Sequence, residues 1–277
     1  MKKEVKGENK ITPILIVLLV VASFLVGSMY SKIKYLEGGG EKVKITDNKA
    51  APTVAAQPAQ PVFSAKKTAT PQVKFFVMAY CPYGIQAEDG LGPVYELLKA
   101  KIDWQPRYVI YKDYCSGAAA AEKATCEKNY CQKNGEEIYC SMHGVAEFNQ
   151  DIREICAANL GDWDKWWKFV NGKNKNCKVG DIETCWKGEA QKAGLDVNKI
   201  TSCFNSQKFT LAKGQTEEMD KYKVSGSPAV FINEVAYNGG RAPEDYKKAI
   251  CSSFETQPEE CKKILGQETA ATAGGCN

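Results

Sequence analysis

VKFFVMAYCPYG, residues 73–84, is the stretch of sequence that decides the fold. Val73–Met78 is a short run of β-branched and aromatic residues, which predicts a buried strand. Cys81 follows at the point where a helical pattern begins. A second apolar run, Tyr108–Tyr111, comes after that helix. The order of strand, cysteine at a helix start, helix and strand predicts a βαβ unit.

Cys81 occupies a position that can make a thiol reactive. The unpaired N–H groups and the positive dipole end of a helix stabilise a thiolate, which is the nucleophilic form of cysteine. Pro82 suits the first helical turn because it lacks the N–H that would stay unpaired there. The alternatives without a reactive role are that Cys81 forms a structural disulfide or is a buried, inert thiol. Further along, Gly90, Gly92 and Pro93 predict a kink or break in the first half of the helix.

The second half of the pattern lies more than a hundred residues further along the chain. Val224–Pro228 precedes the apolar strand Ala229–Ile232, and a turn leads to a second strand, Val235–Tyr237. A helix is expected from about 243 to 254. A proline directly before a strand, preceded by glycine and serine, predicts a tight turn with a cis Ser227-Pro228 bond.

These two motifs, in this order, resemble the thioredoxin fold. The long segment between them resembles the insertion of the DsbA-like branch of thiol–disulfide oxidoreductases, and the resemblance covers residues 73–254. The motif of that family is Cys-x-x-Cys, but Gly84 stands where its second cysteine would be. No acidic residue lies between Val73 and Tyr80, so the buried carboxylate of thioredoxin has no match there.

The resemblance implies roles for five residues. Cys81 would be the catalytic nucleophile, and Ser227 and Pro228 would form a loop that lies against it. Pro82, Tyr83 and this loop would bind the substrate. Without a second active-site cysteine, a separate thiol would have to release any mixed disulfide.

Twelve cysteines, all between Cys81 and Cys276, predict a disulfide framework outside the cytosol. Eight of them fall in the insertion, residues 112–223, whose apolar spacing predicts a small helical subdomain with tryptophans in its core. The pairing of these eight stays open. We expect no metal, because Cys126 and Cys131 lack a second ligand pair.

Two further features concern the remaining cysteines. Cys251 ends the last predicted helix and Cys261 follows it closely, which makes them candidates for a bridge. If Cys81 is free, eleven cysteines remain, and eleven cannot all pair within one chain. Cys276 lies in a glycine-containing tail and is the candidate for the leftover thiol, as a possible resolving partner of Cys81.

The first 72 residues predict an anchor and a tether. Residues 11–30 form an uncharged stretch of 20 residues, long enough for one transmembrane helix. Residues 1–10 carry more lysines than the opposite flank, which predicts a cytoplasmic tail and an extracytoplasmic domain. A cleaved signal peptide is the alternative. Residues 31–72 are expected to be a flexible linker, 73–263 the folded domain and 264–277 a flexible tail.

Composition excludes several classes of function. The chain of 277 residues is 44% hydrophobic and 25% charged, with a net charge of +4, so neither disorder nor nucleic-acid binding is indicated. We expect no cofactor. The leading hypothesis is a membrane-anchored thiol–disulfide oxidoreductase or isomerase whose partners are extracytoplasmic cysteine-containing proteins or an external thiol. The alternative is a redox-inactive thioredoxin-like module that binds or chaperones partner proteins.

Overall fold

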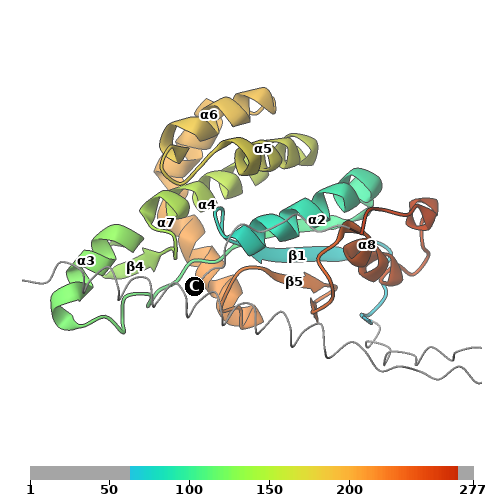
Figure 1. Ribbon diagram of the computed structural model, residues 1–277, viewed down its shortest axis with the longest axis horizontal. Helices are drawn as coiled ribbons and strands as arrows, with labels where there is room; N and C mark the ends of the chain where they lie inside the picture. Colours follow the sequence, from blue (N-terminus) through green and yellow to red (C-terminus); the bar gives the residue numbers. More distant parts are fainter. Residues whose placement is uncertain (1–62, 268–277) are drawn as a thin grey trace, which may run out of the picture. The chain divides into compact units, whose positions relative to one another are not determined.

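A four-stranded sheet lies at the centre of the computed structural model, which describes residues 63–267 (Figure 1). The strands are β1 (Gln72–Val77), β2 (Asp103–Tyr108), β5 (Ala229–Ile232) and β6 (Val235–Tyr237). Their order is β2-β1-β5-β6, with β2 parallel and β5 antiparallel to β1. The predicted strand–helix–strand unit and the hairpin therefore join in one sheet.

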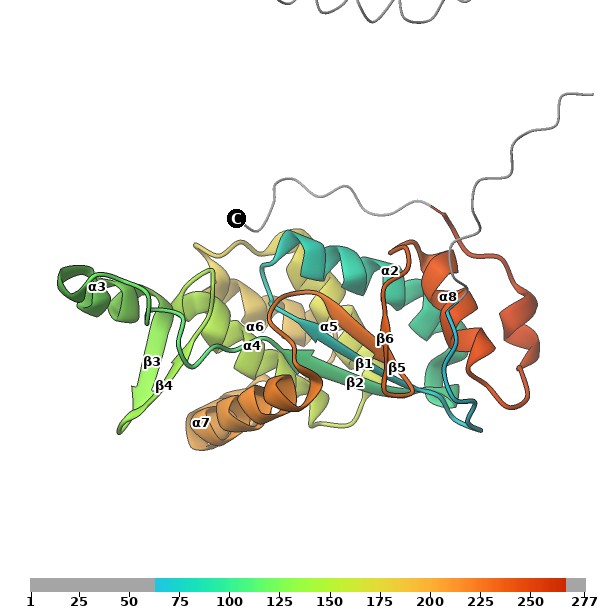
Figure 2. The ribbon, with the colours of Figure 1, turned by 90° about the horizontal axis from the view of Figure 1, so that it is seen from below.

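The two faces of the sheet are covered by different helices (Figure 2). Because strand side chains alternate, Phe75 contributes to the core with α2 (Pro82–Leu98), while Phe76 packs in a separate cluster with Met219. Met219 belongs to the long helix α7 (Val197–Tyr222), and α8 (Pro243–Ser252) packs beside α2. The start of α2 lies where β1 ends, so Cys81 is held at the C-terminal end of this inner strand.

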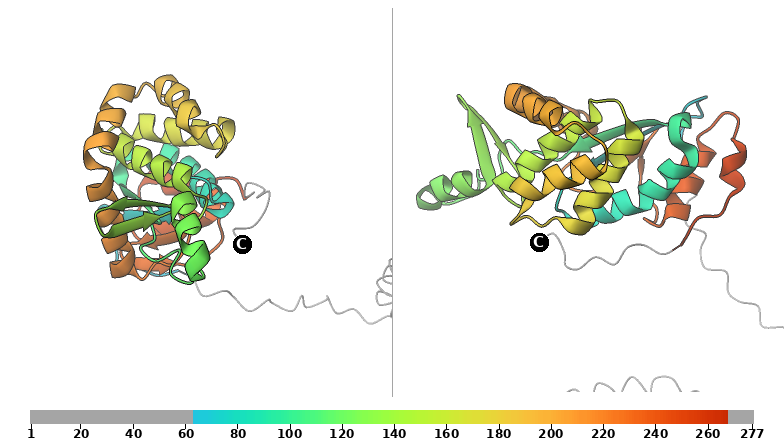
Figure 3. Two further views of the ribbon diagram at one scale, coloured as in Figure 1. Left: turned by 90° about the vertical axis from the view of Figure 1, so that its left-hand side faces the viewer. Right: turned by 90° about the horizontal axis from the view of Figure 1, so that it is seen from above.

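The insertion between β2 and β5 is mainly helical. Its elements are α3 (Ala120–Tyr130), β3 (Cys131–Asn134), β4 (Glu137–Cys140), α4 (Val145–Ala158), α5 (Trp163–Asn176), α6 (Ile182–Lys192) and α7 (Val197–Tyr222). Figure 3 shows α3 and the β3–β4 hairpin at one end of the described region and α8 at the other. The helical insertion is as expected, whereas the hairpin was not predicted.

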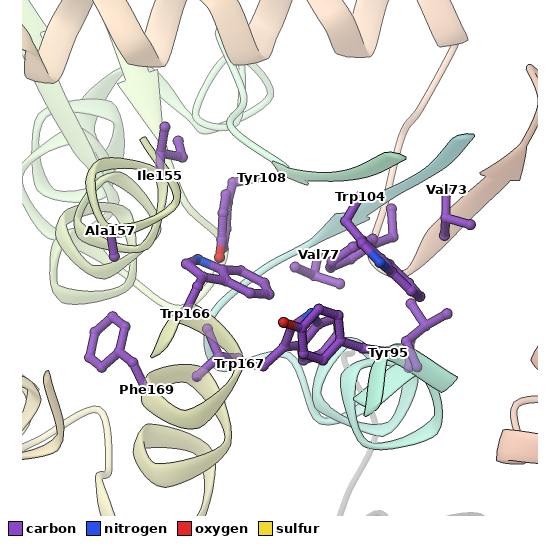
Figure 4. Packing of buried hydrophobic residues seen from close by; sticks show 14 of the residues in the cluster. Val73, Val77, Tyr95, Trp104, Tyr108, Ile155, Ala157, Trp166, Trp167 and Phe169 are labelled. Carbon is purple, nitrogen blue, oxygen red and sulfur yellow. The ribbon is translucent and has the colours of Figure 1, made fainter. Parts of the chain in front are cut away.

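Tryptophans fill the space between the insertion and the sheet (Figure 4). Trp166 and Trp167 are 0% and 1% exposed. The ring of Trp167 stacks on Phe75 at 5.8 Å and on Tyr95 at 5.6 Å, and meets Trp104 edge-on. Burial of large aromatic side chains is among the strongest contributions to a core. The predicted role of these tryptophans is therefore confirmed.

Two predictions about local structure were wrong. Helix α2 runs unbroken through Gly90 and Pro93. A Cβ on Gly90 would lie 2.3 Å from the carbonyl oxygen of Arg241, so this glycine lets α2 approach the start of α8. The second strand lies at Asp103–Tyr108 and not at Tyr108–Tyr111. Its sequence, DWQPRY, is polar because β2 is an edge strand of the sheet, where a proline is tolerated.

Five disulfides cross-link the described residues. They are Cys115–Cys126, Cys131–Cys140, Cys156–Cys203, Cys177–Cys185 and Cys251–Cys261. The last confirms the predicted bridge after α8. Within residues 63–267 only Cys81 is free, and Cys276 lies outside that range.

The folded region begins earlier than position 73. The N–H of Thr68 donates to the carbonyl of Ser253 at 3.0 Å, and Phe63 packs edge-on against Tyr237 at 5.5 Å. Residues 63–72 are thus part of the domain and not linker. Residues 264–266 also contact the domain, since the N–H of Leu265 donates to Glu244 at 2.8 Å.

No helix within residues 63–267 is long and apolar enough to cross a membrane. The expected span at 11–30 lies outside the described residues, as do the rest of the linker and most of the tail.

Candidate functional site around Cys81

Cys81 caps the N-terminus of α2 with an extended backbone, φ −66° and ψ 118°. Its thiol donates to the carbonyl oxygen of Ser227, with 3.6 Å between Sγ and oxygen. The residue is 0% exposed and packs in an apolar cluster with Phe76, Met78 and Met219. The helix start was predicted, but complete burial of the thiol was not.

The loop before β5 lies directly against Cys81. Its Ser227-Pro228 bond is cis, as predicted. The Ser227 hydroxyl accepts the N–H of Met78 at 3.1 Å, so the loop is tied to the end of β1. The phenol of Tyr111 donates to the Ser225 carbonyl at 3.2 Å and holds the other side of the loop. The two sequence motifs therefore meet in space, while the roles assigned to their residues stay predictions.

Gly84 faces the same loop. A Cβ at this position would lie 2.6 Å from the Ser227 hydroxyl oxygen and 3.2 Å from the Met78 carbonyl oxygen. The space beside Cys81 that a second cysteine would need is thus occupied by the Ser227 side chain. Any side chain at position 84 requires this hydroxyl to move.

We expect Gly84→Ala to lower the free energy of unfolding by about 1–2 kcal/mol. The displaced Ser227 hydroxyl would leave the Met78 N–H without its acceptor, and a lost buried hydrogen bond has about this cost. Urea unfolding of the two proteins measures the difference. Gly188→Ala is the control, because a Cβ there meets open space. Equal losses in both variants would show that Ser227 does not fill this space.

The rim of the site is apolar and half-buried. Pro82 and Tyr83 follow Cys81, and Met142 and Phe231 pack against the same cluster from the insertion and from β5. The Arg241 guanidinium lies over the Tyr83 ring, 5.3 Å from its centroid. The predicted substrate-binding residues Pro82 and Tyr83 are therefore beside the cis-proline loop and reachable from solvent.

Buried charged groups hold the backbone just before Cys81. Glu147 accepts the N–H of Tyr80 at 2.8 Å, and Asp151 accepts the N–H of Ala79 at 2.9 Å. Lys173 donates to the Ala79 carbonyl at 2.7 Å. All three side chains are fully buried. They come from α4 and α5, so the carboxylates missing from the first strand are supplied by the insertion.

These acids share one face of α4, together with Glu154 one turn further on. Glu154 pairs with Lys173 at 3.0 Å and accepts the Tyr108 hydroxyl at 2.7 Å. Burial, with the charge of Glu147 second, raises the pKa of Asp151 well above its usual range. The spacing i, i+4 and i+7 of these acids on a helix with apolar neighbours is a sequence signal for such a buried cluster.

Glu88 of α2 extends this buried polar network. Burial raises its pKa to about 8, and Asn174 donates to its carboxyl at 2.7 Å. A group with this pKa is mostly protonated at neutral pH. The network thus surrounds the fully buried Lys173 with several acids, of which Glu88 is held in the neutral form.

His143 lies just before α4 and contacts Glu147 of that helix through both its backbone and its ring. Its N–H donates to Glu147 at 3.0 Å, and its ring Nδ1 lies 2.8 Å from the same carboxyl group. The hydrogen bond to Glu147 raises the pKa of His143 above its ordinary value. Through Glu147, this histidine is linked to the backbone of Tyr80.

The pairing of His143 with Glu147 predicts a pH-dependent stability. A folded-state pKa above the unfolded value of about 6.5 stabilises the fold fully below about pH 6.5. This contribution is lost as the pH rises through the raised pKa. Urea unfolding at about pH 6 and about pH 9 should show a fall for wild type that is smaller in His143→Gln. Parallel changes in the two proteins would contradict this assignment.

Only one cluster of metal-ligand type occurs among residues 63–267: Cys177, Asp181 and Cys185. Cys177 and Cys185 form a disulfide, which removes both thiolates as ligands. The cluster is therefore a bridge beside an exposed aspartate.

The topology, the cis-proline loop and the cysteine at a helix start define a thioredoxin-like domain. Residues 96–251 match the family model described as "Vacuolar sorting receptor thioredoxin-like domain". This match extends over more than half of the chain, and the chain belongs to that family.

The chain is also similar to curated proteins and to solved structures. The chain is 23% identical over 194 residues to Vacuolar-sorting receptor 6 of Arabidopsis thaliana, and 25% identical over 200 residues to Vacuolar-sorting receptor 1 of Pisum sativum. Each alignment covers 62% of this chain but only 31% of the relative, so the chain spans about a third of their length. Reduced DsbG of Mycobacterium tuberculosis is 17% identical, with a TM-score of 0.46 over 72% of this chain and 88% of that protein.

Proposed function

We propose that this domain binds a segment of a partner polypeptide without a dithiol redox cycle. The binding surface, called here the cis-proline edge, consists of the loop at residues 225–228 and the rim of Pro82, Tyr83 and Met142. One observation carries the proposal. Cys81 is unpaired but fully buried, and its thiol is engaged by the Ser227 carbonyl while the Ser227 hydroxyl fills the space beside Gly84. A thiol that attacks a disulfide must be accessible, and this one is not.

The surroundings of Cys81 offer what a polypeptide ligand needs. The rim of Pro82, Tyr83 and Met142 is apolar and half-exposed. Beside it is a cavity of about 360 Å³ lined by residues that include Tyr111, Met219 and Ser225. Its lining combines apolar residues such as Met219 with the charged Lys112 and Asp220, so it takes a side chain that has an apolar stem and a polar end.

The names of the relatives also favour binding. All the curated relatives quoted above are called receptors for vacuolar sorting, and a receptor works by capture and release. This chain spans only about a third of them, so their cargo and pathway are not carried over. Two observations support the proposal together: the relatives are named receptors, and Cys81 is buried and has no second cysteine at position 84.

The test uses one unfolded polypeptide in two forms. In the first form its cysteines are blocked with iodoacetamide, and in the second they carry mixed disulfides. We expect the full chain to bind both equally, and Cys81→Ala to bind as wild type does. Tyr83→Asp should weaken binding by about tenfold, because it places a charge on an apolar rim. The control Val179→Asp places the same charge on an exposed apolar residue between α5 and α6, which is not part of this rim.

A second candidate is thiol–disulfide exchange by a single cysteine. It is favoured by the position of Cys81 at the start of α2 beside the cis-proline loop. A Cys81 thiolate would attack a disulfide of an extracytoplasmic partner and displace one sulfur as a thiolate. An external thiol would then attack the substrate sulfur of the mixed disulfide and release the Cys81 thiolate. If Cys276 attacked the Cys81 sulfur instead, the substrate would leave as a thiolate and a Cys81–Cys276 disulfide would remain for an external thiol to reduce. Capture of only the disulfide form, lost in Cys81→Ala, would establish this alternative.

Location is part of the same proposal. A single span at 11–30 would anchor the chain with its N-terminus in the cytoplasm and the domain outside. Five disulfides among the described residues support an oxidising compartment. Protease protection in intact cells, with mass measurement of the mature chain, tests both topology and cleavage.

A further inference from the structure

A small cavity in the helical insertion is lined by two residues that each carry a hydrogen-bond donor without a partner among residues 63–267. It has a volume of about 180 Å³, and Arg153 of α4, Trp186 of α6 and Phe204 of α7 line it. These three helices pack together in the insertion (Figure 1). None of the lining residues belongs to the site around Cys81, so this cavity is a separate feature.

The unpartnered donors are Nη1 of Arg153 and Nε1 of Trp186, neither of which has a hydrogen-bond partner among residues 63–267. Arg153 is 6% exposed and Trp186 is 2% exposed. The guanidinium lies over both aromatic rings, 5.1 Å from the Trp186 centroid and 5.0 Å from that of Phe204. A buried unpaired donor is costly, and both groups can only donate. Their common complement is an acceptor, and an anionic one suits the guanidinium.

Cationic side chains outnumber carboxylates in the lining of the cavity, so the lining can pair with a second anion. Glu183 pairs with Nη2 of Arg153, but its side chain is 51% exposed. Lys187 also lines the cavity, and Lys208 lies 5.3 Å from the Phe204 centroid. Burial, followed by the charge of Arg153, lowers the pKa of Lys208. Two cationic side chains of the lining, Arg153 and Lys187, therefore face one carboxylate, that of Glu183.

Two disulfides hold the walls of this cavity in place. Cys156 lies one turn after Arg153 on α4 and is bridged to Cys203, the residue before Phe204. Cys185 precedes Trp186 and is bridged to Cys177 at the end of α5. Fixed walls reduce the ordering cost of binding a ligand.

We propose that this cavity binds a carboxylate group of a partner polypeptide, which accepts hydrogen bonds from Arg153 and Trp186. A volume of about 180 Å³ is below the usual size of small-molecule sites, so it takes one acidic side chain or a chain end. The aromatic walls contact the apolar stem of that residue. In the free protein the half-exposed Glu183 pairs with the guanidinium of Arg153, and it moves aside when the ligand binds. This site is independent of the proposed function at the cis-proline edge.

The test follows the indole N–H of Trp186 by NMR in the isotope-labelled full chain, with the signal assigned from Trp186→Phe. The probe is the N-acetylated, C-amidated pentapeptide Ala-Leu-Glu-Leu-Ala, and its partner has Gln in place of Glu. The Glu peptide should shift the signal and saturate. The Gln peptide should bind at least about tenfold more weakly, because it lacks the charge-assisted bonds.

Variants separate a binding role from a structural one. Arg153→Lys should lower the affinity for the Glu peptide by about tenfold, since lysine lacks the planar guanidinium that can donate two parallel hydrogen bonds. Glu183→Gln should strengthen it several-fold, because the internal competitor loses its charge. The exposed Lys248→Gln on α8 should change nothing. If Arg153→Lys does not fold, the wild-type comparison and Glu183→Gln still decide.

Three results would overturn the proposal. The first is equal binding of the Glu and Gln peptides, and the second is weaker binding by Glu183→Gln. The third is a shift produced by acetate at the same concentration as by the peptide, which would make the site one for free carboxylic acids and not for a polypeptide.

Discussion

Lys173→Met should lower the free energy of unfolding by about 3–5 kcal/mol, the largest loss expected from a single polar substitution here. Lys173 and Glu154 are both fully buried and 3.0 Å apart. Removal of the lysine leaves the Glu154 charge uncompensated in the interior. It also removes the donor to the Ala79 carbonyl, which helps to position the loop before Cys81.

Urea unfolding and hydrogen exchange at Ala79 and Tyr80 measure the two effects of this substitution. The double variant Lys173→Met/Glu154→Gln should recover part of the lost stability, because no unpaired charge remains. The exposed Lys165→Met is the control and should leave the free energy of unfolding unchanged. A single variant as stable as wild type would mean that the pair does not hold this loop.

Alkylation of Cys81 by iodoacetamide should be at least about a thousandfold slower in the native protein than in concentrated guanidinium chloride. Reagent can reach a fully buried thiol only after local opening, and this factor corresponds to about 4 kcal/mol of opening free energy. Cys276→Ser is the suitable background, and peptide mapping identifies the modified residue. A native rate close to the unfolded rate would restore Cys81 as the leading nucleophile.

The parts of the fold that the sequence predicted are those decided by local chemistry. Pro82 at a helix start and Gly226-Ser227-Pro228 before an apolar strand are short signals, and the cis bond and hairpin followed from them. Strand β2 was predicted too late in the sequence. Its position at the edge of the sheet permits a polar sequence, which lacks the apolar run that indicates a buried strand. The β3–β4 hairpin is short and mostly polar, so it has no apolar alternation to reveal it.

The candidate site was predicted in outline only. That Cys81 and Ser227 meet was expected from the resemblance, but the complete burial of the thiol depends on side chains of the insertion such as Met219 of α7. The buried acids of α4 and Lys173 of α5 lie far from Cys81 in the sequence, and the helix crossings that bring them together could not be derived from it. The same holds for the pairing of the eight insertion cysteines, which depends on tertiary contacts.

The most direct test of the proposed binding function is a hydrogen-exchange footprint of the cysteine-blocked unfolded polypeptide on the full chain. It should be measured for wild type and for Cys81→Ala. We predict protection of residues 80, 81, 83, 142 and 225–227 in both proteins, with equal affinity. Protection elsewhere, or protection that disappears when Cys81 is replaced, would contradict a polypeptide-binding edge that works without the thiol.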